Sequence, residues 1–335
     1  MVRSVLPALI LIATGMAMPV AALAGNPAGA AASNTTLGVG GSTLTGPGVD
    51  ATETCEIVAP PPSSLDTPSK YNQAIGSKSI ADPVSAQVRS KAMSPVTDAI
   101  RRLEATGRFG PGQALPTAAA CVFQTLDIWA REGSLTQMRS EDANLSRDRF
   151  MVSITALIAD LDPKGDSLSR HDDVRRWLAA ISVQTMRFYD IEAGPISRRN
   201  NHRYWAGLSV GQTGVLLKDH RMIDWARSSL ETGLCQIDGS GFLPLEVDRA
   251  AKAFDYHLYA YVALGSLDRL LGPSEPGRCS EALLRLGDLV RDGMRSDIAF
   301  ERRTGVRQDK PGRDNLLKAR RLLQDRHSPG TGSEF

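Results

Sequence analysis

The segment from Asn200 to Trp205 concentrates side chains that could bind an anion and move a proton. It reads Asn-Asn-His-Arg-Tyr-Trp and follows Arg198 and Arg199, so amide, imidazole, guanidinium and aromatic groups share one short stretch. The segment lies at the start of an expected helix, where Asn is a preferred N-cap residue. For this segment alone a structural explanation stays open, with an Asn cap, a hydrogen-bonded His202 and a buried Trp.

A second segment, Gly-Phe-Leu-Pro-Leu-Glu at 241–246, opens an expected helix that carries Arg249, Lys252 and Tyr256. Arg249 and Tyr256 are seven residues apart, which places them two turns apart on one helix face. Small Ala253 between them leaves a gap that a sugar ring could fill. Taken alone, Arg249 could equally form a surface ion pair and Tyr256 a core anchor.

Together the two segments resemble the alginate lyase family of polysaccharide lyases, specifically the mannuronate-specific periplasmic type of family 5. The family's Asn-Asn-His-x-Tyr-Trp-Ala signature is matched by residues 200–206, and its Asp-x-x-Gly-Phe-Leu-Pro-x-Glu stretch by residues 238–246. The likeness runs from about Cys55 to Gln308. Further matching segments are Ser69–Tyr71, Ala119–Cys121, Trp129–Arg131 and Tyr256–Ala260.

The resemblance implies that the protein cleaves a 4-linked uronate polymer, mannuronate-rich alginate, by β-elimination and leaves unsaturated uronate ends. The C5 proton of a uronate is barely acidic while its carboxylate keeps its charge, so donors aimed at the carboxylate must stabilise an enolate-like dianion. By resemblance, Asn201, His202 and Arg249 have this role. In mannuronate the C5 proton and O4 lie on the same face of the ring, so Tyr256 could be both base and acid. The competing assignment has His202 as base and Tyr256 as acid, and it suits substrates of the opposite C5 configuration.

Contacts to neighbouring sugar units follow from the same resemblance. Lys70 and Arg203 would bind the carboxylates of those units. Tyr71, Trp205 and Tyr259 complete the expected substrate-binding set.

The spacing of cysteine and histidine residues gives no metal-site pattern. The sequence has no Cys-x-x-Cys pair, and His171, His220 and His327 lack ligand spacing. We therefore expect neither a metal nor another cofactor.

Helices must position these side chains, because apolar residues recur at spacings of three and four along most of the chain while strand-like alternation is hardly visible. Asp82-Pro83 is a good N-cap and N1 pair, and Ser94-Pro95 favours a helix restart. The periodic segments are 121–129, 154–161, 174–181, 223–234, 253–264 and 283–290. We predict an all-α fold of antiparallel helix pairs, an (α/α) toroid or incomplete helical barrel, with Trp129, Trp177 and Trp225 in its core.

Composition divides the chain into four expected parts. They are a signal peptide at 1–24, a flexible linker at 25–54, a helical toroid lyase domain at 55–310 and a basic C-terminal tail at 311–335. The linker is rich in Gly, Ala, Ser and Thr and cannot bury enough apolar surface to become ordered. The tail is either a solvated terminal helix with a frayed end or a contact to an acidic polymer, and it stands where the family has a closing aromatic helix.

The first residues predict export to the periplasm or secretion. Arg3, an apolar run from Val5 to Met18 and Ala-Leu-Ala at 22–24 match the parts of a signal peptide, with a membrane anchor as the alternative. An even number of cysteines suits disulfides in an oxidising compartment. Sequence does not determine their pairing; we favour Cys55–Cys121 and Cys235–Cys279.

The charge balance favours a local rather than a global anion site. The net charge of +2 and the pI near 8.4 give no strong overall field, which argues against a nucleic acid partner. The expected partner is an acidic polysaccharide bound by a monomer. Such an enzyme either degrades polymer as food or clears misplaced polymer during secretion, and in the second case a polysaccharide secretion machinery becomes a further partner.

Three alternatives to a lyase for alginate stay open from the sequence. The substrate could be polyglucuronate or another acidic exopolysaccharide, or the protein could bind polymer without cleaving it. A glycoside hydrolase would need two carboxyl groups across a cleft. Glu246 and Asp255 lie nine residues apart on one expected helix, which disfavours that chemistry.

Overall fold

The computed structural model describes residues 55–108, 115–272, 279 and 281–325, and these residues are predominantly helical. Their one sheet is a pair of short parallel strands, β1 (Ser64–Leu65) and β2 (Gln137–Met138). The all-α prediction is therefore confirmed. The expected signal peptide and linker, residues 1–54, lie outside the described residues.

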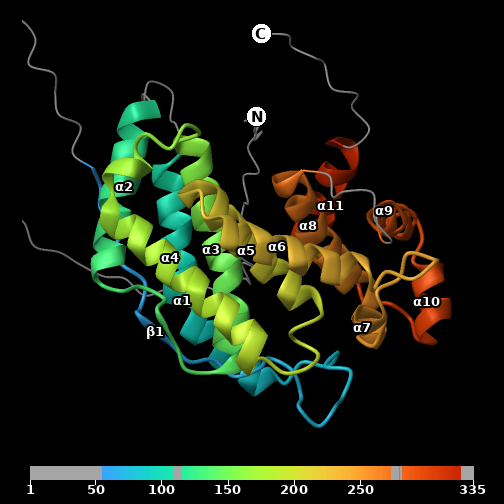
Figure 1. Cartoon of the computed structure of the whole chain (residues 1–335). Coiled ribbons are helices and arrows are strands. Elements are labelled where there is room, and N and C mark those ends of the chain that lie inside the picture. Colours follow the sequence, from blue (N-terminus) through green and yellow to red (C-terminus); the bar gives the residue numbers. More distant parts are fainter. Residues whose placement is uncertain (1–54, 109–114, 273–278, 280, 326–335) are drawn as a thin grey trace, which may run out of the picture.

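The helices lie in two groups joined by a central pair. In Figure 1, α1 to α4 are on one side of the molecule and α7 to α11 on the other, with α5 and α6 between them. The α-helices are α1 Pro83–Thr106, α2 Leu115–Arg131, α3 Glu141–Leu161, α4 Asp172–Arg187, α5 Asn201–Leu217, α6 His220–Leu234, α7 Pro244–Val247, α8 Ala253–Leu271, α9 Ala282–Gly293, α10 Ile298–Thr304 and α11 Arg313–Asp325. Three short helical turns are η1 Leu168–Arg170, η2 Phe188–Glu192 and η3 Ala250–Lys252.

Each group of helices has its own apolar core. Trp129 and Trp177 are buried in the core of α1 to α4, as predicted. The other core lies among α5, α6, α8, α9 and α11. Trp225 was predicted in the core, and this was wrong in part: it is only half-buried, because its indole N–H donates to the exposed Asp190 carboxylate at 2.9 Å.

Helix α1 begins as predicted and continues through a proline. The Asp82 side chain accepts a hydrogen bond from the backbone N–H of Ser85 at 3.0 Å, which makes it the N-cap. The predicted restart at Ser94-Pro95 was wrong, since Pro95 lies inside the helix. Pro95 has no N–H for the carbonyl of Lys91, and the Ser94 hydroxyl donates to that carbonyl at 3.2 Å instead.

Residues 313–325, which the sequence assigned to the basic C-terminal tail, form a helix that packs against the helices before it. They form α11, whose Ala319, Leu322 and Leu323 are buried in the core of α8 and α9. An ion pair of 3.0 Å between Arg269 and Asp325 joins α8 to the end of α11. The apolar residues sit at positions three and four apart, which gives this basic segment one buried face.

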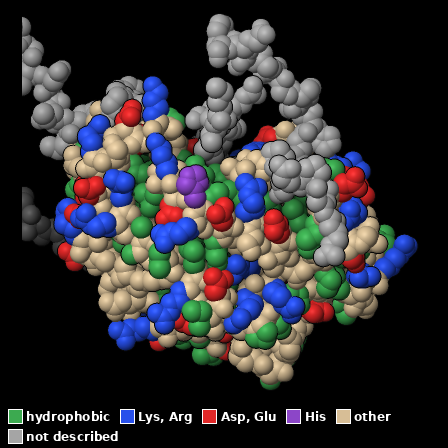
Figure 2. All heavy atoms as spheres, viewed as in Figure 1, with side chains coloured by type: hydrophobic (Ala, Val, Ile, Leu, Met, Phe, Trp, Pro, Cys, Tyr) green, Lys and Arg blue, Asp and Glu red, His purple; other side chains and the backbone are tan. Residues whose placement is uncertain are grey.

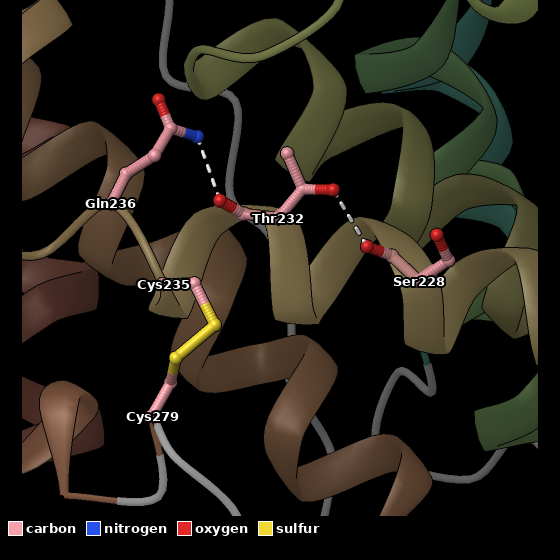
Figure 3. Close-up of a disulfide and its surroundings, with 5 residues drawn as sticks. All are labelled: Ser228, Thr232, Cys235, Gln236 and Cys279. Atoms are coloured by element: carbon pink, nitrogen blue, oxygen red, sulfur yellow. Dashed lines mark hydrogen bonds between the residues drawn. A yellow bond between two sulfur atoms is a disulfide. The ribbon is translucent and has the colours of Figure 1, made fainter.

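The two favoured disulfides both form, and one of them fixes the end of α6. The pairs are Cys55–Cys121 and Cys235–Cys279. Figure 3 shows the second pair beside the last turn of α6, where the Thr232 hydroxyl donates to the Ser228 carbonyl at 2.8 Å and Gln236 Nε2 donates to the Thr232 carbonyl at 2.7 Å. This covalent link holds the end of α6 near the start of α9.

The surface carries mixed charge. On the face shown in Figure 2, Lys and Arg side chains are interspersed with Asp and Glu side chains. Within the described ranges, no helix combines the length and the apolarity needed to cross a membrane.

A tight turn precedes α7 and fits only glycine at one position. Asp238 Oδ1 accepts the backbone N–H groups of Ser240 and Phe242 at 2.9 and 3.0 Å. Gly241 has a φ of +88°, and a Cβ at this position would lie 2.5 Å from the carbonyl oxygen of Arg285. Both the backbone conformation and the close approach therefore require glycine.

We expect Gly241→Ala to lower the free energy of unfolding by roughly 3 kcal/mol, because it combines left-handed backbone strain with a clash against backbone atoms. Gly239→Ala is the matched control: nothing lies within 4 Å of the added Cβ, so its effect stays within about 0.5 kcal/mol. Denaturant unfolding of both variants measures the difference. Equal losses would contradict the assignment of strain to Gly241.

Candidate active site

One cleft contains both sequence segments that were singled out. Its volume is about 530 Å³, and it is lined by residues 69–78, α1, α3, the start of α5, the α7–α8 region and α11. His202 and Tyr256 both line it. Every predicted site residue except Arg203 lies in its wall.

The start of α5 presents its first residues to this cleft. The Asn200 side chain caps the helix by accepting the backbone N–H of His202 at 3.1 Å. The positive end of a helix dipole therefore faces the cleft, which favours an anion there. Asn201 and His202 follow directly and carry their side chains to the same place.

A buried carboxylate fixes Asn201. Glu246 Oε1 accepts the Asn201 backbone N–H at 2.8 Å and its Nδ2 at 2.9 Å, and both residues are fully buried. Burial raises the pKa of Glu246, while the two bonds from Asn201 act in the opposite direction. One hydrogen of Asn201 Nδ2 stays available for a ligand. From the sequence, Glu246 was a candidate only for a hydrolase carboxylate. Its place in the Gly-Phe-Leu-Pro-x-Glu stretch was the available signal for this positioning role.

Arg249 and Tyr256 meet, although not on one helix as predicted. Arg249 lies in the turn between α7 and α8, where Ala250 adopts a φ of +51° and interrupts the helix. The Arg249 guanidinium carbon is 3.9 Å from the Tyr256 ring centroid and 5.1 Å from that of Tyr71. Arg249 Nε is buried and has no hydrogen-bond partner among the described residues, so the guanidinium can still accept an anionic ligand.

The loop of residues 69–82 holds Lys70 and Tyr71 at the mouth of the cleft. An antiparallel bridge joins Tyr71 to Ala81, and the Asp82 N–H donates to the Lys70 carbonyl at 3.0 Å. The Lys70 ammonium lies 5.0 Å from the Tyr71 ring centroid. The hydroxyl oxygens of Tyr71 and Tyr256 are 2.5 Å apart, so these two phenols share a hydrogen bond.

The two phenols differ in acidity. Burial raises the pKa of Tyr256 well above 10, and Arg249 opposes the rise only in part. Burial also acts to raise the pKa of Tyr71, but the Lys70 ammonium, the hydrogen bond with Tyr256 and the Arg249 guanidinium together hold it below 10. The two phenols titrate as a pair, and the Lys70 and Arg249 cations favour its deprotonated form.

His202 is neutral in the free protein. Burial lowers its pKa to about 3, and the positive charges of Arg249, Arg89, Lys78 and Lys70 add to the shift. The same cations would attract a carboxylate into the cleft. A neutral imidazole can accept a proton or donate one N–H.

Aromatic side chains and further cations line the rest of the cleft. The rings of Trp205 and Tyr259 are 4.9 Å apart, and the Arg149 guanidinium lies 5.7 Å from the first and 5.3 Å from the second. Arg149 and Arg89 were missed from the sequence, since no motif surrounds either of them, and Lys318 was noted only as part of the basic C-terminal segment.

The prediction that Arg203 binds a substrate carboxylate was wrong. Its guanidinium forms an ion pair of 2.8 Å with Asp190, donates through Nε to Ser229 at 2.8 Å and stacks 3.9 Å above Trp225. On α5 this position faces α6, whereas His202 and Trp205 face the cleft. Arg203 therefore joins α5 to α6.

The two carboxylates that the hydrolase alternative would use, Glu246 and Asp255, both hold parts of the fold together. Glu246 is buried against Asn201 in α7, and Asp255 lies in α8. Asp255 Oδ1 accepts the Gly312 N–H and Asn315 Nδ2, both at 2.9 Å, and so anchors α11. In the part of the chain that the structure covers, no group of three His, Cys, Asp or Glu side chains is arranged to hold a metal.

Comparison with solved structures places the chain among the α/α toroid proteins. Alginate lyase A1-III from Sphingomonas species A1 has a TM-score of 0.61 at 19% identity, over 84% of this chain and 80% of that one. A histidine-to-alanine variant of A1-III complexed with a tetrasaccharide gives 0.62 at 18% identity, over 80% of this chain and 76% of that one. At this level of identity the likeness establishes the fold, and the predicted (α/α) toroid is confirmed.

Sequence comparison then gives the family. The family model for alginate lyase matches residues 66–271. An alginate lyase of Pseudomonas putida is 30% identical over 203 residues, 58% of this chain and 55% of that protein. One of Pseudomonas fluorescens is 26% identical over 270 residues, 78% of this chain and 72% of that protein. The chain belongs to the alginate lyase family, and it spans about half the length of the curated relatives that it first matches.

Removal of the Glu246 carboxylate should loosen the start of α5. We expect Glu246→Ala to lower the free energy of unfolding by roughly 3 kcal/mol, because two buried N–H groups of Asn201 lose their acceptor. Glu246→Gln keeps one acceptor oxygen and should lose less than half as much. Denaturant unfolding and hydrogen exchange of the Asn201 amide measure the effect, and a glutamine variant as unstable as the alanine variant would exclude the acceptor role.

Proposed function

We propose that this protein cleaves mannuronate-rich alginate by β-elimination, with Asn201, His202, Arg249 and Tyr256 as its catalytic residues. The observation that carries the proposal is that these four side chains, from two segments separated in the sequence, line one cationic cleft. Lys70, Tyr71, Trp205 and Tyr259 contact the neighbouring sugar units in this scheme. Family membership supports a polysaccharide lyase, and the relatives named above are alginate lyases.

The first requirement of the reaction is to neutralise the carboxylate next to C5. Arg249 offers a buried guanidinium, and Asn201 Nδ2 and the imidazole N–H of His202 add neutral donors. These donors are fixed before substrate arrives, since Glu246 holds Asn201 and Tyr256 stacks on Arg249. Fixed donors in a partly buried site stabilise a developing dianion without having to reorganise.

The second requirement is proton transfer at C5 and O4, and the phenol pair supports it. The deprotonated pair shares one proton across the hydrogen bond between Tyr71 and Tyr256. Tyr256 passes its proton to Tyr71 across the shared hydrogen bond as its own oxygen takes the C5 proton. The C4–O4 bond then breaks, the electron pair forms the C4–C5 double bond, and Tyr256 protonates the departing O4. One phenol can do both in mannuronate, where both groups lie on one face; His202 as base is the assignment for the opposite configuration.

The names of solved relatives support an oligosaccharide ligand. Alginate lyase A1-III was solved with a tetrasaccharide both in a histidine-to-alanine and in a tyrosine-to-phenylalanine variant. Histidine and tyrosine are two of the residue types that this cleft brings together. For this chain the mannuronate preference stays a proposal.

Two disulfides support export to the periplasm or the outside of the cell, because such bonds persist in oxidising compartments. The signal-like pattern at 1–24 agrees with this assignment. Accumulation of the mature protein in a periplasmic or culture fraction is the direct test.

Purified protein mixed with polymannuronate should generate the ultraviolet absorbance of unsaturated uronate ends. Tyr256→Phe should lower kcat by about 10²–10⁴-fold, because it removes the acid and base, while polymer binding persists. Tyr204→Phe is the control, since this buried phenol bonds the Arg199 carbonyl outside the cleft. Unchanged turnover in Tyr256→Phe contradicts the assignment, and no absorbance with polymannuronate, polyguluronate or polyglucuronate contradicts lyase activity itself.

The pH profile should carry no inflection from histidine. A histidine pKa of 6.5 would make kcat/KM fall below that pH, but with a pKa of about 3 His202 stays neutral from pH 5 upward. We expect kcat/KM to rise with pH toward a plateau set by the Tyr71–Tyr256 pair below pH 10, because deprotonation of the pair supplies the base. Steady-state kinetics and NMR titration of the imidazole check this, and an inflection near 6.5 that vanishes in His202→Ala would exclude a neutral His202.

A further inference from the structure

The C-terminal helix α11 contributes a cation to the cleft that the proposed chemistry does not use. Lys318 and Arg149, from α11 and α3, both line the cleft. The charged groups that shift the pKa of Lys318 most are different from those that shift the pKa of His202. Lys318 comes from α11, whereas Lys70 comes from the loop before α1 and Arg249 from the turn between α7 and α8.

Lys318 is partly buried and lies near a like charge, the exposed guanidinium of Arg149. Burial is the largest cause that lowers the pKa of Lys318 to about 8, and the charges of Arg149 and of Arg321 in α11 contribute to the shift. Asp314 of α11 and Glu104 of α1 act in the opposite direction without preventing the fall. Burial also raises the pKa of Glu104, so this acid is a weak counterion.

Neither cation is neutralised by a direct ion pair. Within the described part of the chain, the ion pairs include other basic residues of the cleft, such as Arg89 with Asp142 at 3.1 Å, but not Lys318 or Arg149. A bound carboxylate would relieve the repulsion between the two cations. The partial burial of Lys318 strengthens its contact with such a carboxylate, because water screens the contact less.

The helix that carries Lys318 is fixed relative to the catalytic phenol. Asp255, directly before Tyr256, accepts hydrogen bonds from the Gly312 N–H and from Asn315 Nδ2 at 2.9 Å. Leu322 and Leu323 of α11 are buried in the core that α8 and α9 also form. Lys318 is thus held at a set position relative to Tyr256.

We propose that Lys318, together with Arg149, forms a subsite for the carboxylate of a uronate unit bound away from the reacting unit, and that it sets a preference for longer acidic oligomers. This inference rests on the proposed function for its ligand class. Arg149 can bind a carboxylate through two parallel N–H groups, and Lys318 adds a point charge. Short oligomers that fill only the catalytic part of the cleft would not reach it.

The test measures binding in the Tyr256→Phe background by calorimetry, with saturated mannuronate oligomers from dimer to hexamer. Lys318→Gln should weaken binding of the hexamer by about tenfold and leave the shortest bound oligomer unaffected. Arg320→Gln, on the exposed face of α11, is the matched control and should change neither. Lys318→Arg should keep the hexamer affinity, and unfolding curves confirm that each variant is folded.

The pH dependence adds a readout that a structural role would not give. The affinity advantage of the hexamer over the shortest oligomer should decline above about pH 8 with Lys318 and persist with Lys318→Arg. Equal weakening at all lengths in Lys318→Gln, or no weakening, overturns the inference even if the wild-type protein cleaves alginate. Conversely, if Lys318→Gln weakens binding only of the longer oligomers while the wild-type protein cleaves none of them, the subsite is supported and the lyase reaction is rejected. If no oligomer binds, both the subsite and the lyase reaction are overturned.

Discussion

The hydrogen bonds between the buried Glu246 carboxylate and Asn201 are the contact on which the cleft depends. They join the start of α5 to the short helix α7, and these segments are far apart in the sequence. The same turn carries Arg249 toward Tyr256. Burial of this carboxylate costs free energy of desolvation. The two hydrogen bonds that it accepts from Asn201 offset that cost, because both N–H groups would otherwise be buried without an acceptor. Without the Glu246 carboxylate, the Asn201 amide and the Arg249 guanidinium would not be held at a fixed distance from each other.

Basic side chains in this protein divide according to whether they have a counterion. Arg203 is paired with Asp190 and stacked on Trp225, so its charge is satisfied within the fold. Arg249 and Lys318 lie in the cleft, and neither forms an ion pair with a described residue. Unpaired cations that repel one another lower the stability of the folded protein, and they are kept where a polyanion can neutralise them. This contrast separates binding residues from structural ones better than residue type does.

Local patterns in the sequence predicted much of the fold but not how its elements connect. The capping pair Asp82-Pro83, the helical periodicities and the disulfide pairing agree with the structure. The continuity of α1 through Pro95 depends on the Ser94 hydroxyl, a compensation that propensity rules do not include. The break at Ala250 depends on tertiary contacts, because alanine favours helix in isolation.

The same distinction applies to the site. Motif residues such as His202 and Tyr256 could be found because their types and spacing are unusual together. Arg203 lies inside the same motif and yet faces α6, since a helix turns each successive side chain to another direction. Lys318 shows the converse. Its segment looked like a charged tail because Arg and Lys dominate its composition, while Leu322 and Leu323 were enough to bury one face. When an amphipathic basic helix closes a cleft, the buried face determines where the helix lies, and the remaining face determines which charge the ligand meets. The part of the cleft formed by His202 and Tyr256 is thus encoded in compact motifs, whereas the part formed by Lys318 is encoded in a helix without one.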